Sequence, residues 1–79
     1  MEKNELFEKV KVIIAEKLDI DANEVKLDSS FVNDLKADSM DILDLLSGFE
    51  EEFKVTIPDE KGRTFETVGQ AVEYLVTIV

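Results

Sequence analysis

Three separate stretches of this chain carry apolar residues at the three-and-four spacing of a single helix face, and this pattern constrains the fold most. The stretches cover approximately residues 6–18, 39–53 and 68–79. Lys54-Val55-Thr56-Ile57 alone has the composition of a strand. With no second strand to pair with, it is expected to be extended loop. The sequence therefore predicts an all-α fold, a small bundle of three principal helices plus one short helical turn.

Capping residues predict where the helices begin and end. Asn4 is the expected N-cap of the first helix, which should fade near Leu18. The second helix should run from about Asp38 or Ser39 to Phe53.

The remaining helical segments lie near the C-terminus. Asp59-Glu60-Lys61 should form the short turn, ended by Gly62. Thr67-Val68-Gly69-Gln70 fits a capping box and should open the last helix. The residues expected to face inward are Leu6, Phe7, Val10, Ile13, Ile14 and Leu18 in the first helix, Ile42, Leu45, Leu46, Phe49 and Phe53 in the second, and Val68, Ala71, Val72, Leu75 and Val79 in the last.

A long connection separates the first two helices and covers residues 19–34. Val25, Leu27, Phe31 and Leu35 should anchor it over the helices, because a long loop in a compact domain needs buried contacts of its own. Its first residues resemble the start of a calcium loop, but Glu24 replaces the required glycine, so no metal site is predicted.

Length and charge exclude several classes of function. The 79 residues suit a single domain spanning 1–79. The chain has neither cysteine nor histidine, and its formal net charge of −10 disfavours nucleic acid and anionic membranes as partners. Basic protein surfaces are the natural complement. With no signal-peptide layout and no apolar run of about 20 residues, we expect a soluble intracellular protein without membrane insertion.

Ser39 stands at the predicted start of the second helix, and four interpretations of it compete. A helix cap would need no further function. A hydrolytic nucleophile would need an adjacent base, and the chain has no histidine. Phosphorylation would suit the helix dipole, but Asp38 and Asp41 crowd the position with like charge. An attachment point for a phosphodiester-linked group would need an exposed hydroxyl at a helix N-terminus, where a phosphate is accommodated.

The residues around Ser39 carry a resemblance to a known family. Asp38-Ser39-Met40, preceded by Leu35 and Ala37 and followed by an acidic helix, resembles the Asp-Ser-Leu motif of acyl carrier proteins. The other segments that match the family's layout are Phe31-x-x-Asp34-Leu35, Phe49-Glu50-Glu51-Glu52-Phe53, Ile57-Pro58 and Thr67-Val68-Gly69. Nearly the whole chain is covered. It departs from the common pattern at Lys36, where glycine is usual, and at Met40, where leucine is usual.

The resemblance implies an acyl-carrier-protein-like fold and a carrier with no catalytic residues of its own. Ser39 would carry a 4'-phosphopantetheine arm, transferred from coenzyme A by a holo-acyl-carrier-protein synthase that supplies the metal and the base. The arm would hold growing fatty acyl chains as thioesters and present them to the enzymes of a dissociated fatty acid synthase. A chain without cysteine is consistent with a thiol that arrives with its cofactor.

The acidic second helix is the expected docking surface. Six acidic residues and no basic residue lie between Asp38 and Glu52. Family members present this helix to basic patches on synthases and transferases, and the matching positions here are Asp38, Met40, Asp41, Asp44 and Glu51, with Glu50 and Glu52 at the rim. Met40, Asp44, Ser47, Gly48 and Glu51 should share its outward face.

Several alternatives stay open at this level. The cargo could belong to a polyketide, aminoacyl or D-alanyl pathway, because loading enzymes decide it. A different class would be a non-carrier acidic helical interaction module with Ser39 as a cap. Ile42, Leu46, Ile57, Ala71 and Leu75 could line a space for an acyl chain, although core packing explains them equally well. The resemblance further implies a cytoplasmic monomer.

Overall fold

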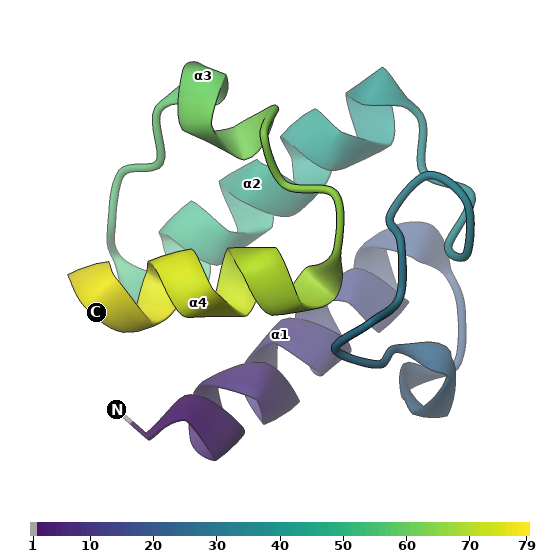
Figure 1. Cartoon of the computed structure of the whole chain (residues 1–79), viewed down its shortest axis with the longest axis horizontal. Helices are drawn as coiled ribbons and strands as arrows, with labels where there is room; N and C mark the ends of the chain where they lie inside the picture. Colours follow the sequence, from purple (N-terminus) through teal and green to yellow (C-terminus); the bar gives the residue numbers. More distant parts are fainter. Residues whose placement is uncertain (1) are drawn as a thin grey trace.

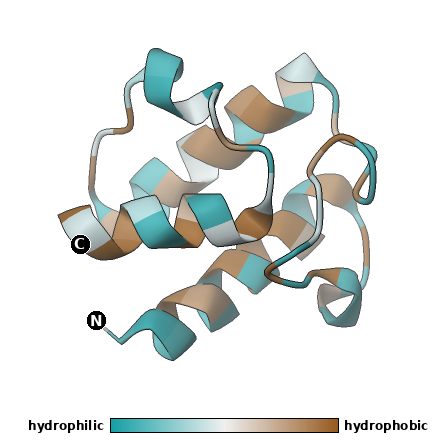
Figure 2. Ribbon diagram, in the orientation of Figure 1, coloured by the Kyte–Doolittle hydropathy of each residue, from teal (hydrophilic) through white to brown (hydrophobic). Residues whose placement is uncertain are grey.

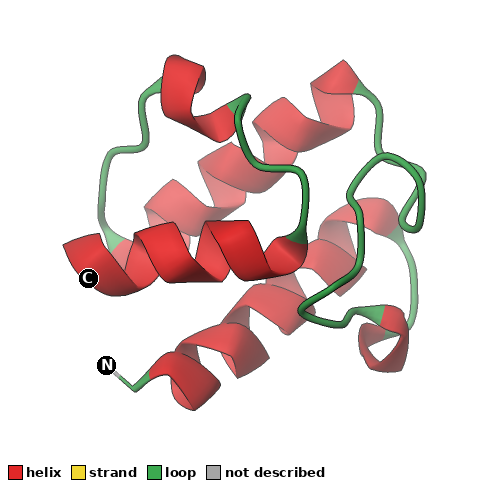
Figure 3. Ribbon diagram, viewed as in Figure 1, coloured by secondary structure: helices red, strands yellow, loops and turns green. Residues whose placement is uncertain are grey.

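A computed structural model describes residues 2–79, and this part of the chain is helical (Figure 3). The elements in order are α1 (Lys3–Leu18), the 3-10 helix η1 (Ala22–Glu24), α2 (Ser39–Phe53), α3 (Asp59–Gly62) and α4 (Val68–Ile78). Within residues 2–79 the β pairing is confined to one isolated bridge between Ser30 and Thr67. The predicted bundle of three principal helices and one short turn is confirmed.

The three long helices pack around a common centre (Figure 1). α1 contacts both α2 and α4, and α3 packs against α2. The connection from η1 to α2 runs along one end of the bundle, where α2 begins. The start of α1 and the end of α4 lie on the opposite side of the bundle.

Most predicted boundaries are confirmed, with one exception at the start of α1. Asn4 does not cap this helix: the N-cap is Glu2, whose carbonyl accepts a bond of 3.0 Å from the N–H of Leu6. Leu6 is fully buried, and its packing stabilises a helix that begins before Asn4, the residue that capping preference alone would select as the N-cap. α1 and α2 both end at residues in the left-handed region, Asp19 with φ 56° and Lys54 with φ 54°.

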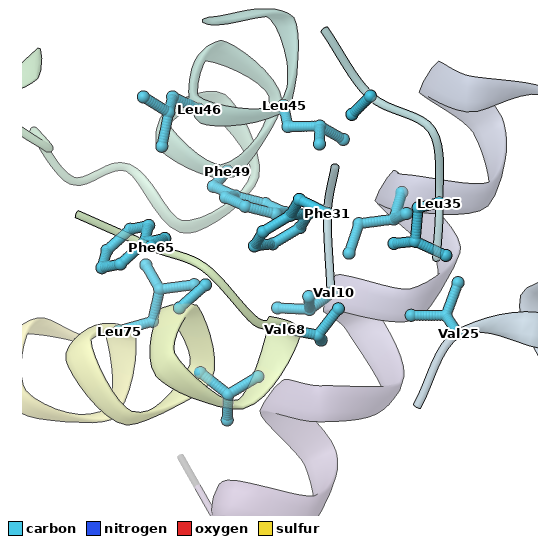
Figure 4. Close-up of a cluster of buried hydrophobic side chains, with 14 of the residues drawn as sticks. Val10, Val25, Phe31, Leu35, Leu45, Leu46, Phe49, Phe65, Val68 and Leu75 are labelled. Atoms are coloured by element: carbon cyan, nitrogen blue, oxygen red, sulfur yellow. The ribbon is translucent and has the colours of Figure 1, made fainter. Parts of the chain in front are cut away.

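Buried aliphatic and aromatic side chains from all three long helices form one core (Figure 4). The hydrophobic segments of α1, α2 and α4 alternate with hydrophilic ones along each helix, as amphipathic packing requires (Figure 2). Two expected inward residues are wrong. Leu27 is 42% exposed and Val79 is 41% exposed. Val79 follows the last turn of α4, and Leu27 anchors its loop through its carbonyl rather than its side chain.

Gly48 was expected on the outward face of α2, and this is wrong because it is buried against α1. A Cβ atom there would lie 3.0 Å from Cγ2 of Ile13 and 3.2 Å from Cε of Lys17. The glycine therefore permits the close approach of α1, a contact within the chain. Ser47 and Glu51 are exposed on the outward face as predicted.

The long connection is fastened to the first turn of α4. The N–H groups of Val68 and Gly69 donate to the carbonyls of Ser29 and Leu27 at 3.0 and 2.8 Å, and the N–H of Phe31 donates to the carbonyl of Glu66 at 3.0 Å. The predicted capping box of α4, between Thr67 and Gln70, is present. These bonds satisfy helix N–H groups that would otherwise lack acceptors, so α4 holds the segment that leads to α2.

Replacing Gly69 by alanine should destabilise the protein by about 1–3 kcal/mol, the usual range for overpacking. The added Cβ would lie 2.9 Å from the carbonyl oxygen of Leu27, a backbone atom that cannot rotate away. Gly48→Ala is the matched control, because it meets side-chain atoms and gains about 1 kcal/mol of helix propensity. Urea unfolding of both variants tests this expectation. A Gly69→Ala variant as stable as Gly48→Ala would contradict it.

Candidate functional site

Ser39 is the first residue of α2, and its side chain is exposed. The cap of this helix is Asp38, whose Oδ1 accepts a bond of 2.9 Å from the N–H of Asp41. Oδ2 of Asp41 accepts in return from the N–H of Asp38 at 3.1 Å. The capping box therefore fixes where α2 starts without using the Ser39 hydroxyl.

The surroundings of the four serines of the chain separate Ser39 from the rest. Ser29 is buried and its hydroxyl accepts from the N–H of Lys26 at 3.0 Å. The hydroxyl of Ser30 accepts from the N–H of Asn33 at 3.1 Å. Ser47 is exposed in the middle of α2, away from the helix start. Ser39 combines exposure with a place at a helix N-terminus, the combination that a phosphodiester requires.

The start of α2 fits a phosphate group. Among the described residues, the N–H groups of Ser39 and Met40 have no backbone or side-chain acceptor. These groups belong to the orphan donors of a helix N-terminus, where the helix dipole favours negative charge. A phosphate carried on the Ser39 oxygen would lie beside them.

The three residues before Asp38 are held in a fixed arrangement. Leu35 and Ala37 are buried, and their N–H groups donate to the carbonyls of Ser30 and Phe31 at 3.0 and 2.8 Å. Lys36, between them, has φ 59° and an exposed side chain. This left-handed conformation suits glycine and costs another residue about 1 kcal/mol. Glycine would adopt this conformation without strain, so the departure at Lys36 noted from the sequence falls on a backbone that favours glycine.

The outward face of α2 carries both acidic and apolar groups. Met40 is 78% exposed, and Asp44 and Glu51 are exposed on the same side of the helix. Leu43 is 47% exposed and was not singled out from the sequence. Its position outside the stripe of Ile42, Leu45, Leu46 and Phe49 was the available signal, because an apolar residue off the core face has to meet solvent or a partner.

Three of the predicted docking and rim residues also accept backbone hydrogen bonds that stabilise the fold. Asp38 and Asp41 form the capping box, and Asp41 is half-buried. Oε2 of Glu50 accepts from the N–H of Ile57 at 2.8 Å and so ties the segment after α2 to the helix. Glu52 is exposed. Asp44 and Glu51 are therefore the acids of α2 whose replacement tests docking with the least effect on folding.

A small apolar void of about 10 Å³ lies between α2, α3 and the connection, next to the packed rings of Phe31 and Phe49 (Figure 4). Of the residues considered as acyl linings, Ile42 and Leu46 border it. Ile57, Ala71 and Leu75 are buried but do not border it. The void has room for about one water molecule, so an acyl chain would have to displace core side chains to enter.

Most of the charge of this protein is unpaired. Within residues 2–79 two ion pairs form, Lys3 with Glu73 and Glu8 with Lys11. Because 19 acidic residues oppose 9 basic ones, raising the salt concentration should screen their repulsion and raise the melting temperature. Thermal unfolding between 0.01 and 1 M salt measures this, and a constant melting temperature would contradict it.

No helix in the described part of the chain is long and apolar enough to cross a membrane.

Comparison with known proteins assigns the family. Residues 8–75 match the family described as the phosphopantetheine attachment site. The acyl carrier protein of Clostridium acetobutylicum is 51% identical over 70 residues, which cover 89% of this chain and 91% of that protein. The acyl carrier protein of Petrotoga mobilis is 53% identical over 75 residues, covering 95% and 88%. The chain therefore belongs to the acyl carrier protein family, as a carrier rather than an enzyme, with 4'-phosphopantetheine as its prosthetic group.

Proposed function

We propose that Ser39 is the attachment residue and that the protein carries fatty acyl chains through the reactions of a dissociated fatty acid synthase. The observation that supports the attachment most directly is the exposed Ser39 side chain at the first position of α2, where Asp38 does the capping. The neighbouring N–H groups of Ser39 and Met40 would stabilise the phosphate. The arm supplies the thiol that this chain lacks.

The attachment step needs an external enzyme. The Ser39 oxygen bonds to the β-phosphorus of coenzyme A, 3',5'-ADP leaves, and the hydroxyl proton passes to a base. This chain has no histidine to act as that base. A holo-acyl-carrier-protein synthase would supply the base and the metal, while the present chain supplies a fixed and accessible oxygen.

The outward face of α2 would be the docking surface for this synthase and for the fatty acid synthase enzymes. This face offers the exposed carboxylates of Asp44 and Glu51 beside the exposed apolar side chains of Met40 and Leu43. Such a surface suits a basic patch with an apolar centre. Asp38 and Asp41 would add charge close to Ser39. Complementary charge of this kind acts mainly on the rate of association.

Reversing Asp44 to lysine should slow the modification of Ser39 by about tenfold at low salt, within the range by which electrostatic steering raises association rates. Glu5→Lys is the matched control, because it makes the same charge change at an exposed helical site in the first turn of α1, across the bundle from the start of α2 (Figure 1). Initial rates with coenzyme A and a holo-synthase measure the effect, with circular dichroism to confirm folding. Equal slowing by both variants would point to net charge instead of docking.

Fatty acid synthesis is the typical pathway of acyl carrier proteins, and this chain is about half identical to proteins of that name. Intact mass spectrometry of the protein isolated from its own cells tests the assignment. Saturated, 3-hydroxy and 2-enoyl chains on the arm are expected for fatty acid synthesis. Polyketide, aminoacyl or D-alanyl cargo would assign the protein to that other pathway instead. A protein that never carries an arm in its own cells would support the alternative of a non-carrier acidic interaction module.

The same proposal includes the state in which the protein works. We expect residues 1–79 to act as one carrier domain, as a cytoplasmic monomer that meets its enzymes one at a time. The net charge of −10 favours this, because like-charged copies repel each other. Sedimentation at physiological salt measures the oligomeric state, and a stable dimer would contradict it.

A further inference from the structure

We propose that Lys36 is a positioning residue for the prosthetic group, through an ion pair between its ammonium group and the phosphate carried on Ser39. The proposal rests on attachment at Ser39, and it does not depend on the nature of the acyl cargo.

The backbone conformation at Lys36 would suit glycine, and this draws attention to the lysine side chain. Three residues other than glycine have positive φ in the described part of the chain: Asp19, Lys36 and Lys54. Asp19 and Lys54 are helix C-caps, where a left-handed residue ends the helix and satisfies its last carbonyls. Lys36 follows no helix, but it ends the turn over residues 31–35, where the N–H of Ala37 donates to the carbonyl of Phe31 at 2.8 Å. Glycine would end this turn without strain, so a lysine here is a reason to ask what its side chain does.

The surroundings of Lys36 fix its position while leaving its side chain free. Buried Leu35 and Ala37 lie on either side, each with its N–H bonded to the carbonyl of a residue in the connection. Within residues 2–79 no carboxylate lies within ion-pair distance of the Lys36 ammonium group. The ammonium group is thus exposed and available for a negative group nearby.

Charge and reach indicate the phosphate as that group. Lys36 is the sole basic residue in the sequence between residues 27 and 53, a segment that holds eight acidic residues. It precedes Ser39 by three residues, so their Cα atoms are at most about 10 Å apart. A lysine side chain is long enough to bring its ammonium group across that distance to a phosphate linked to Ser39. The pair would hold the base of the arm near the start of α2 and offset the repulsion from Asp38 and Asp41.

The test compares apo and holo forms of the wild type, Lys36→Gln, Lys36→Arg and Lys54→Gln. Glutamine keeps a long side chain at the left-handed position and removes the charge, and arginine restores the charge. Lys54→Gln is the matched control, because it removes an exposed lysine with the same backbone conformation at the far end of α2. Mass spectrometry first confirms one arm on Ser39, so an unloaded serine would refute the proposed attachment before Lys36 is tested.

Two measurements then report on the pair. The ³¹P NMR signal of the phosphodiester should move in Lys36→Gln, return in Lys36→Arg and stay in place in Lys54→Gln. The difference should vanish at 1 M salt, where the screening length is about 3 Å. The gain in the folding equilibrium constant on going from apo to holo should be about twofold to fivefold smaller in Lys36→Gln than in the wild type, the range of an exposed ion pair.

The proposal is overturned if the phosphorus signal and the apo-to-holo gain are the same in Lys36→Gln and the wild type. It is also overturned if Lys54→Gln changes them as much as Lys36→Gln does, because the effect would then come from net charge. Lys36→Gln should leave the stability of the apo form nearly unchanged, since the side chain is exposed.

Discussion

Ser39→Ala should abolish loading of the prosthetic group completely, while the variant keeps the fold and stability of the parent. The change removes the proposed phosphate acceptor, and no other serine joins an exposed side chain to a helix start in the described residues. Asp38 and Asp41 keep the capping box, so α2 still begins at residue 39. Incubation of the apo protein with coenzyme A and a phosphopantetheinyl transferase, followed by intact mass measurement, gives the result directly.

Ser47→Ala is the control for this experiment. It removes an exposed hydroxyl from the same helix, two turns after Ser39, and it should load as the wild type does. Loss of loading in both variants would mean that α2 itself was disturbed. Continued loading of Ser39→Ala would place the arm on another residue and refute the proposed site.

Phe49→Ala should lower the free energy of unfolding by about 3–5 kcal/mol, the usual cost of truncating a buried aromatic residue. Phe49 is 1% exposed and lies at the centre of the core, beside Phe31 (Figure 4). A domain of this length is stabilised by roughly 4–12 kcal/mol in total. The variant should therefore lose a large share of its total free energy of unfolding. Urea unfolding followed by circular dichroism measures this loss.

Phe53→Ala is the matched comparison, one helical turn further along α2. Its ring is half-buried, so less apolar surface returns to water and the loss should be clearly smaller. Equal losses for the two variants would show that the core does not centre on Phe49. Added salt should not restore Phe49→Ala to the stability of the parent, because the missing contacts are apolar.

The periodic pattern predicted the helices well because their stability comes from burying one face. Leu45, Leu46 and Phe49 are buried as expected, and the capping boxes of α2 and α4 were readable from short local motifs. The errors lie where tertiary contacts decide. Gly48 meets α1, a contact that a helical wheel of α2 alone cannot include.

At the candidate site, too, features set by local sequence were predicted and features set by tertiary contacts were not. Ser39 and the acidic face of α2 were identified from sequence, because motif and charge are local properties. The left-handed backbone at Lys36 and the bond from Ile57 to Glu50 were not predicted, since both depend on how the connection and the end of α2 fold back on the helices. Exposure of Leu43 was readable in principle from its place outside the apolar stripe.

The placement of the two chain ends has a practical consequence. The first turn of α1 and the last turn of α4, which lead to these ends, lie across the bundle from the start of α2 (Figure 1). A purification tag, a fluorophore or a surface linker joined at either terminus would thus extend away from the serine and from the enzymes that approach it. Immobilised or fused versions of this carrier should remain open to modification, which makes the protein a convenient module for displaying thioester cargo.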